Sequence, residues 1–562
     1  MTFSPSRLAA HSKIPWRVRL NEMRSERATF DAHWREIDLF MAPGRFRDGH
    51  SADENRGEKK HRKIIDETAL RARRVFVAGF VSGMTSPARP WFKLTVADSD
   101  LAEFSAVRAW LEEVEKRINL VLARSNFYHA IVNVYDDLGT FGTAALSVTE
   151  RPESIVWFRP HPVGDYYVSA NDDMLVDTIY RQTKLTVRQL VERFGRENCS
   201  ASTLSSYESG NTEHRVDVIQ AIEPNDDRIR NLRNFVNMPY RSVWFEESGE
   251  ADKYLGRFGF EEFPSMVVRW QASPLDDYGI DCPGMTALGG VKQLQHQQLK
   301  KGQAIDKMVN PHLQVPPTLK GVRSFLPGGT TVYDQTSPNG GIRPIHDVNL
   351  RLDYMLRDIQ EVQHRVNESF FVDLFLMISQ QDSVRTATEI ALRNEEKLLV
   401  LGPALQRVQT ELLDPLLDRV FAIMERAGEI PLPPPELEGA PLQVKYISML
   451  AQAQQSVVAS SVERFLGAAG SMAQMNPGVL DKVDFDETLE EYAEILGVPQ
   501  RLLKSNEDVD AQRQAQAEQA AAAEQLLTLQ QGAEAAKTVS EVDASPEGAL
   551  AGILDRVDMF RD

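Results

Sequence analysis

The sequence predicts an α+β fold in which helices predominate, and three observations support this prediction. Apolar residues recur every three or four positions over several long segments, as on the buried face of an amphipathic helix. Between residues 144 and 270 the pattern changes to short alternating segments rich in aromatic and β-branched side chains, which is typical of antiparallel strands. Residues 311–346 contain so many Pro and Gly residues that only short strands and turns fit there.

The bulk composition limits the classes of protein to consider. A chain of 562 residues is too long for a single hydrophobic core, so we expect several parts. The net charge of -18 argues against binding nucleic acid through the overall field, although DNA could still slide past such a protein. Cys199 and Cys282 are too few for a disulfide framework or a four-cysteine zinc site, and we interpret them as structural thiols. No stretch approaches about 18 uninterrupted apolar residues, which disfavours membrane insertion.

The N-terminal part is predicted to contain four helices. They cover residues 6–41, about 65–86, 101–124 and 126–139. In the second of these helices we expect a buried face made of Ile65, Leu70, Val77 and Val81. The sheet region that follows is interrupted by one predicted helix, at 186–195.

Two long helices are predicted on either side of the Pro/Gly-rich segment. The first, at 285–309, is rich in Gln and Lys, and the second, at 348–376, has a strong apolar repeat. A further long helix is predicted to begin near 387, because Thr386 to Glu389 have the spacing of a capping box. Pro403 and Pro415 are expected to kink it.

The last helical region is predicted over about 448–535. It passes into an Ala/Gln-rich end that can be helical but has little to bury, so an oligomer surface or partial disorder is expected there.

Motifs for catalysis or metal binding are missing from the sequence. There is no P-loop, no H-E-x-x-H and no paired C-x-x-C. Ser82 lacks the spacing of a nucleophile elbow, and we expect Gly79 and Gly83 beside it to serve close helix packing. His161 and His364 have no second ligand at i+3 or i+4, so we interpret them as structural or surface residues.

Adjacent carboxylates occur at Asp136–Asp137 and Glu395–Glu396. We interpret both pairs as solvated helix faces, with an acid/base or metal pair left open by their spacing.

Lys300, Lys301 and Lys307 form a basic group on the Gln-rich helix. Two interpretations remain open for them. They belong either to an ordinary solvated helix face or to a polar wall that faces water and a polyanion.

Residues 370–390 combine an apolar run, a polar stretch and a new helix start. Three interpretations fit this pattern: a membrane-insertion element, a core helix that ends in a loop, or a mobile loop that lines a cavity or channel. The composition disfavours the first.

The order of these parts resembles that of the portal, or head-to-tail connector, family of short-tailed bacteriophages. The similar segments are residues 66–94, 126–146, 162–168, 370–421 and 444–455. The resemblance covers residues 10–510, and its specificity lies in the collinearity of several segments, since none is a catalytic signature.

The resemblance implies a layout for the whole chain as a portal fold. Its parts would be a wing at 1–283, a first stem helix at 284–310, a clip at 311–346, a second stem helix at 347–376, a tunnel loop at 377–386, a long kinked wing helix at 387–430, a helical crown at 431–535 and a partly flexible tail at 536–562. The tunnel loop would consist of Gln380, Gln381, Asp382, Ser383, Val384 and Arg385, and Lys300, Lys301 and Lys307 would line the channel.

The implied function is that of a ring, a dodecamer in this family, at one vertex of the capsid. Double-stranded DNA would pass through the ring, without sequence specificity, during packaging and ejection. The implied protein partners are the terminase large subunit, tail adaptor proteins, and the major capsid and scaffolding proteins. No enzymatic activity, cofactor, metal or membrane is expected, and the protein would reside in the host cytoplasm during assembly and then in the virion.

Two other functions compete with this one. A structural tail-ring or minor capsid protein would share the composition, but would not be expected to have a clip between two stem helices. A nucleic-acid enzyme would need a nucleotide loop or a metal-binding acidic cluster, and the first of these is absent from the sequence.

Overall fold

A computed structural model describes most of the first 450 residues and short stretches after them. The described residues are 16–47, 63–96, 101, 104–229, 234, 236–250, 253–309, 313–314, 343–344, 352–379, 400–437, 442–448, 450, 465–472, 488, 509, 512–516 and 519. The chain separates into two compact units, Met1–Val483 and Asp484–Asp562, and the architecture below is that of the first unit.

The predicted N-terminal helices are present, apart from residues 6–15 of the first, which lie outside the described residues. They are α2 (Trp16–Phe40), α3 (Thr68–Met84), α5 (Ser105–Arg124) and α6 (Phe127–Phe141). The face predicted for α3 is wrong in part, because Ile65 is 53% exposed and only Val77 of the expected residues is fully buried. The buried face is instead formed by Ala69, Ala72, Phe76, Gly79, Phe80, Gly83 and Met84.

The predicted antiparallel sheet region forms two sheets. The smaller has the order β3-β2-β9, and the larger has the order β4-β5-β6-β7-β8, with every pair antiparallel. The strands are β2 (Thr143–Arg151), β3 (Ile155–His161), β4 (Tyr166–Ala170), β5 (Val176–Thr186), β6 (Arg215–Pro224), β7 (Tyr240–Glu246), β8 (Gly256–Phe260) and β9 (Ser265–Arg269).

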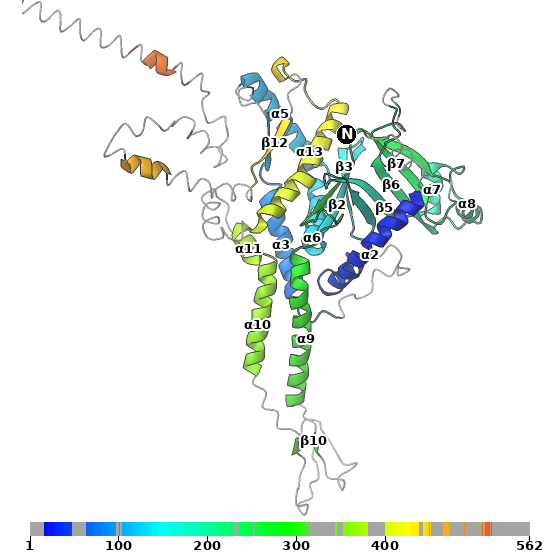
Figure 1. Cartoon of the computed structure of the whole chain (residues 1–562), viewed down its shortest axis with the longest axis vertical. Helices are drawn as coiled ribbons and strands as arrows, with labels where there is room; N and C mark the ends of the chain where they lie inside the picture. Colours follow the sequence, from blue (N-terminus) through cyan, green and yellow to red (C-terminus); the bar gives the residue numbers. More distant parts are fainter. Residues whose placement is uncertain are drawn as a thin grey trace, which may run out of the picture. The chain divides into compact units, whose positions relative to one another are not determined.

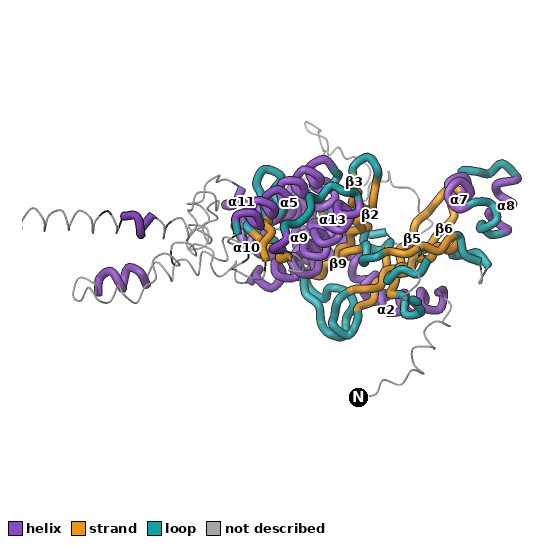
Figure 2. The backbone as a smooth tube through the Cα atoms, turned by 90° about the horizontal axis from the view of Figure 1, so that it is seen from above, coloured by secondary structure: helices purple, strands orange, loops and turns teal. Residues whose placement is uncertain are grey.

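The larger sheet is covered on both faces. On one face, Leu20 and Met23 of α2 pack against Tyr180, Ile219 and Val243. On the other face lie the predicted helix α7 (Val187–Phe194) and a second, unpredicted helix, α8 (Ala201–Glu208), over a separate core that includes Trp244. Helices α2 and α7 therefore lie on opposite sides of this sheet (Figure 2).

A strand pair that joins distant parts of the chain was not predicted. Strand β1 (Phe92–Val96) pairs antiparallel with β12 (Leu442–Tyr446), so that Phe92 lies opposite Tyr446. Each segment is five residues long. Both segments, FKLTV and LQVKY, alternate apolar and polar residues as half-buried strands do, so a local strand signal was present. The sequence gives no signal that the two distant segments pair with each other.

Two long helices run side by side below the sheets (Figure 1). They are α9 (Pro283–Val309) and α10 (Leu352–Ser369). Between them in the sequence the structure describes only the short antiparallel pair of β10 (Leu313–Gln314) with β11 (Arg343–Pro344).

The predicted single helix at 348–376 is wrong, because the chain breaks after Ser369. Phe371 has a φ of 52°, a left-handed conformation that costs energy for a bulky residue and ends a right-handed helix. A second helix, α11 (Val372–Ser379), then starts in a new direction and packs against α3.

The long helix predicted from 387 is described only from Val400 onward, so its predicted start and the capping box lie outside the described residues. Pro403 lies within the helical residues 400–407. A π-helical segment, η2 (Val408–Leu413), and α13 (Asp414–Arg426) follow, with Pro415 in the first turn of α13. Farther on, the residues described in the predicted helical region 448–535 include a helical stretch at 465–472. Among the helices that the structure describes, none has the length and apolar character needed to span a bilayer.

Candidate functional site

The six predicted tunnel-loop residues, Gln380 to Arg385, lie outside the described residues. The element that leads into them, α11, is described through Ser379. What the structure provides is therefore the anchor of this segment on its N-terminal side.

Helix α11 is anchored by close packing on α3. A Cβ atom added to Gly79 would lie 2.3 Å from the Cβ of Phe375, so only a glycine allows this approach. The Phe375 ring also meets Phe76 edge-on at 5.5 Å between ring centroids. Gly83 similarly leaves room for Leu450. The prediction that Gly79 and Gly83 serve close packing is confirmed.

Ser82, between these glycines, donates a hydrogen bond to the backbone oxygen of Gly79 at 3.1 Å. This bond lies inside the helix, as expected for a serine that satisfies its hydroxyl locally. The structure therefore gives no support to a nucleophile at this position.

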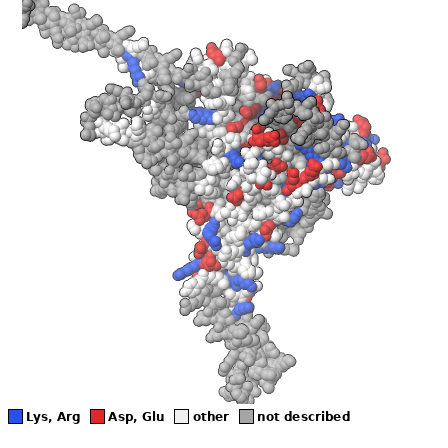
Figure 3. Space-filling model, viewed as in Figure 1, with Lys and Arg blue, Asp and Glu red and all other residues white. Residues whose placement is uncertain are grey.

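The three predicted lysines lie on the part of α9 that is distant from the sheets. Lys300 and Lys307 are exposed and Lys301 is half-buried, and within the described chain no ion pair is formed by any of the three. Lys292, closer to the sheets on the same helix, is paired with Glu36 of α2 at 2.5 Å. Figure 3 shows basic side chains toward this far end of α9 and α10. The structure thus brings the three lysines together on one helix, with no ion pair among the described residues.

The glutamines of α9 have a role that the sequence analysis missed. Gln295 is buried, accepts hydrogen bonds from the backbone N–H groups of Ile65 and Asp66, and donates one to the backbone oxygen of Asp66 at 3.0 Å. The side-chain amides of Gln298 on α9 and Gln363 on α10 each donate to Oδ2 of Asp66 at 2.9 Å. One carboxylate just before α3 therefore joins both long helices.

The environment of Asp66 keeps this carboxylate charged. Burial alone would raise its pKa, but hydrogen bonds from Thr68, Gln298 and Gln363 to the ionised form outweigh that effect, and the pKa lies below its ordinary value. An acidic residue two positions before a helix is a common capping pattern, but its glutamine partners come from far along the chain and give no local signal.

The interpretation of Asp136 and Asp137 as a solvated helix face is wrong. Asp137 is only 3% exposed, and both carboxylates pair with Arg45, at 2.8 Å from Asp136 and 2.7 Å from Asp137. Arg73 approaches Asp136 at 3.5 Å. Burial raises the pKa of Asp137 to about 7 in spite of the attraction of Arg45. The other pair, Glu395–Glu396, lies outside the described residues.

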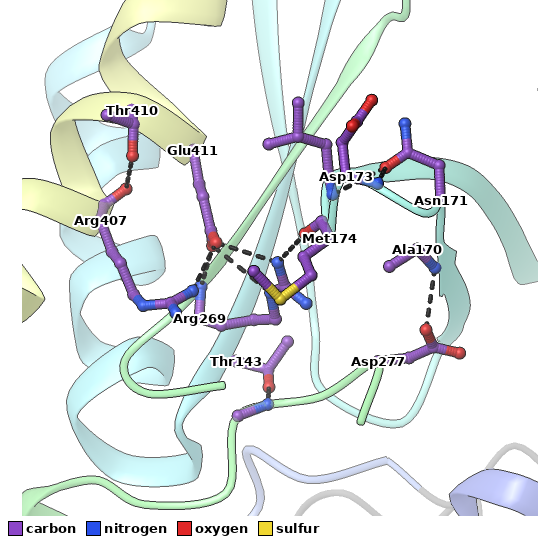
Figure 4. A network of polar contacts seen from close by, with 12 residues as sticks. Thr143, Ala170, Asn171, Asp173, Met174, Arg269, Asp277, Arg407, Thr410 and Glu411 are labelled. Carbon is purple, nitrogen blue, oxygen red and sulfur yellow. Dashed lines mark hydrogen bonds and ion pairs between the residues drawn. The ribbon is translucent and has the colours of Figure 1, made fainter. Parts of the chain in front are cut away.

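A second buried charge pair holds the π-helical segment. Glu411 of η2 accepts hydrogen bonds from the backbone N–H and the guanidinium of Arg269, both at 2.9 Å, and pairs with Arg407 at 2.8 Å (Figure 4). Arg269 also donates to the backbone oxygen of Met174. Because Arg269 is 1% exposed, this contact fixes the long C-terminal helix to strand β9.

The remaining candidates are structural, except His364, which is exposed on α10. His161 is buried, and its Nε2 lies 2.7 Å from Oγ of Ser147, which in turn contacts Ser265. Burial lowers the pKa of His161 well below its ordinary value, so the ring is neutral. Both cysteines are buried thiols, as predicted, and burial raises the pKa of Cys199 to about 11 and that of Cys282 to about 12. In the described part of the chain, no group of three metal-ligating side chains occurs.

Comparison with known proteins supplies the identity that the geometry alone does not. A family described as bacteriophage head to tail connecting protein matches residues 16–503. A probable portal protein of Bordetella phage BPP-1 is 42% identical over 539 residues, which cover 95% of this chain and 96% of the relative.

The portal protein of Salmonella phage epsilon15 is 41% identical over 540 residues, with coverage of 95% and 97%. A solved chain of a gene transfer agent virion aligns with a TM-score of 0.28 at 11% identity, covering 75% of this chain and 99% of that one. This structural similarity is too low to support a conclusion about the fold or the function. The chain belongs to the family of bacteriophage head to tail connecting proteins, and its function is that of a phage portal.

Proposed function

We propose that this portal acts as a ring of identical copies around an axial channel for double-stranded DNA. The observation that carries the proposal is a group of exposed apolar side chains on two neighbouring helices, α9 and α10. Its members are Leu299, Ile305, Met308, Val309, Tyr354 and Leu356, with exposed fractions from 41% to 70%. Single exposed apolar residues are common on protein surfaces, but several on adjacent helices indicate an interface. The partner surface is the same pair of helices in the next copy.

In this arrangement α9 and α10 are the two stem helices, and residues 311–346 between them are the clip. The wing comprises residues 1–283, the long helix that contains η2 and α13, and β12 (Leu442–Tyr446), which pairs with β1 and so is not part of the helical crown predicted from 431. The crown comprises the remaining C-terminal region up to residue 535. The break at Phe371 divides the second stem helix, so that α11 runs against the wing helix α3 and not along the stem. Residues 377–379, which the predicted tunnel loop included, are the last residues of α11, so the loop is shortened to 380–386. Its movement is limited at its N-terminal side by the contact between Gly79 and Phe375.

The channel contacts DNA weakly. Gln380, Gln381, Asp382, Ser383, Val384 and Arg385 approach the phosphate backbone with small polar groups and one cation. Lys300, Lys301 and Lys307 add positive charges along the stem, within a chain whose net charge is -18. A strongly basic channel would hold the polymer, whereas a few cations in an acidic ring allow it to slide.

The clip is the docking surface for the terminase large subunit and later for tail adaptor proteins, because a Pro/Gly-rich excursion buries little of its own surface. The wing and crown meet the major capsid and scaffolding proteins. The protein acts in the host cytoplasm during assembly and at the capsid vertex in the virion. Energy for packaging comes from the terminase, since this chain has no P-loop.

Mass photometry of the purified chain, combined with an ATPase assay in magnesium, tests this proposal. A discrete species of high mass without ATP hydrolysis is expected. A monomer at micromolar concentration, or magnesium-dependent hydrolysis by the isolated chain, would contradict it and favour an enzyme. A tail-ring or minor capsid protein is separated from a portal by asking whether the rings nucleate capsid assembly.

A further inference from the structure

Among the described residues, three arginines gather on the α7 side of the five-stranded sheet without an acidic partner. Arg181 of β5 is 8% exposed, and its guanidinium carbon lies 5.2 Å from the ring centroid of Trp244. Arg193 of α7 covers the same ring at 4.5 Å. Arg159 of β3 is exposed beside them. Within the described residues, none of the three side chains forms an ion pair or a hydrogen bond, and Nε of Arg181 is buried without an acceptor.

The pKa of Arg181 is consistent with a positive charge that has no counter-charge nearby. Burial, and then the charges of Arg159 and Arg193, lower the pKa of Arg181 to about 9. A buried cation that lacks a counter-charge is costly in an isolated chain. The cost is removed when a carboxylate from outside reaches the cluster.

Acidic side chains gather on the opposite side of the same sheet. Glu22 and Glu26 are exposed on α2, and Asp276 and Asp277 lie close by in the segment between β9 and α9. Burial, and then the charges of Asp277 and Glu22, raise the pKa of Glu26. Leu275, beside these aspartates, is 94% exposed. Trp244 itself is buried, so the accessible members of the cluster are Arg159 and Arg193. A projecting segment that carries carboxylates is complementary to them in charge.

The two surfaces are separated by the sheet, so they do not meet within one chain. Side chains alternate between the faces of a strand, which puts Tyr180 toward α2 and Arg181 toward α7. The register continues across the sheet, with Arg181 opposite Gln220 and Gln220 opposite Trp244. Figure 2 shows α2 and α7 on opposite sides of β5 and β6.

We infer that the arginine cluster of one copy receives the acidic segment around Leu275 and Asp276 of the next copy, and that this contact fixes the order of wings in the ring. Different surfaces on opposite faces of a subunit make a head-to-tail contact, which closes into a ring when the rotation permits. The inference rests on the proposed ring. Beyond the proposed ring, it names the two surfaces that meet between neighbouring copies. It also proposes that their opposite charges set the orientation of each copy.

Cross-linking between copies tests the inference directly. The variant Leu275→Cys/Arg193→Cys is treated, as assembled full-length protein, with a short bismaleimide and separated under denaturing conditions. A ladder of covalent oligomers is expected from the double variant. An equal mixture of the two single variants should give covalent dimers only, because each copy then carries a single reactive cysteine. Either single variant alone should give none, because the two native cysteines are buried.

Charge reversal supplies a second readout. Arg159→Glu/Arg193→Glu and Glu26→Lys/Asp276→Lys should each raise the protein concentration for half assembly on the order of tenfold, with an effect that shrinks in high salt. When all four changes are combined, the protein concentration for half assembly should return to within about threefold of that of the original chain. Arg188→Glu is the matched control, since Arg188 is exposed on α7 and lies 3.9 Å from Glu213, away from the cluster.

The outcomes separate the two proposals. If the original chain forms no ring, the proposed function fails. If rings form but no ladder appears and reversal changes assembly no more than the control, this inference alone is overturned, and the arginine cluster serves another anion.

Discussion

Gly79 of α3 and Phe375 of α11 are in contact at a distance that only glycine permits. The added Cβ at position 79 would stand 2.3 Å from the phenylalanine side chain. This contact connects α3 to the segment that leads into the predicted tunnel loop.

Replacing Gly79 with Ala is expected to force α11 away from α3 and to lower the free energy of unfolding by about 1–3 kcal/mol, as overpacking does. Urea unfolding followed by circular dichroism measures the loss. The matched control is Gly289→Ala on α9, where the added methyl meets nothing and better helix propensity should stabilise by about 0.5–1 kcal/mol. Adding Phe375→Leu to Gly79→Ala should recover part of the loss. Equal stability of the two alanine variants would contradict the packing account.

Asp66→Ala is expected to leave the amides of Gln298 and Gln363 without their acceptor, and to reduce the free energy of unfolding by about 1–3 kcal/mol. Because the folded pKa of Asp66 is lowered, its contribution is complete above the ordinary carboxyl pKa and is lost as the pH falls through the folded value. The difference in unfolding free energy between the original chain and the variant should therefore be constant near neutral pH and shrink in acid. Urea unfolding over a pH series measures it.

The control for this series is Asp306→Ala, on the exposed far part of α9, which should change stability little at any pH. If the difference in unfolding free energy between Asp66→Ala and the original chain grew in acid, Asp66 would not stabilise the fold in its charged form.

Glu411→Ala is expected to leave the buried guanidinium of Arg269 without its counter-charge and to cost about 3–5 kcal/mol of unfolding free energy. Thermal or urea unfolding measures this. Glu425→Ala, at an exposed position of α13, is the control and should be close to neutral. Similar losses in both variants would show that the Glu411 pair is not the contact that holds the π-helical segment to β9.

The local patterns of the sequence were sufficient for most helices and for the antiparallel strands, because spacing along the chain carries that information. The glycine packing of α3 was also predicted, since Gly79 and Gly83 lie one turn apart. What the sequence lacked was information about contacts between distant segments. The pairing of β1 with β12 and the bonds of Gln298 and Gln363 to Asp66 exist only once the chain is folded.

The same limit explains the errors. Asp136 and Asp137 have the composition of a solvated face, and only the approach of Arg45 from the loop after α2 makes them a buried ion-pair network. The break at Phe371 was hidden by an apolar repeat that continues through it, because Phe370 and Leu374 are both buried on either side. The tunnel-loop assignment of Gln380 to Arg385 remains a prediction.

Replacing Lys300, Lys301 and Lys307 with Ala is expected to leave ring assembly intact and to weaken binding of duplex DNA to the rings. Each phosphate contact that is lost should reduce the slope of log affinity against log salt by about 0.9. Fluorescence anisotropy with a short duplex over a salt series measures this slope. Lys292→Ala is the control, because Lys292 is already paired with Glu36. If the triple variant showed the same slope of log affinity against log salt as the original chain, these lysines would not contact DNA in the channel.

Electron microscopy of the purified full-length chain is the measurement that tests the central claim most directly. The account predicts closed rings with an axial hole, in which α9 and α10 of neighbouring copies pack against each other along the channel and residues 380–385 point to the axis. Monomers, open filaments, or rings in which α9 and α10 lie on the outer surface would contradict it.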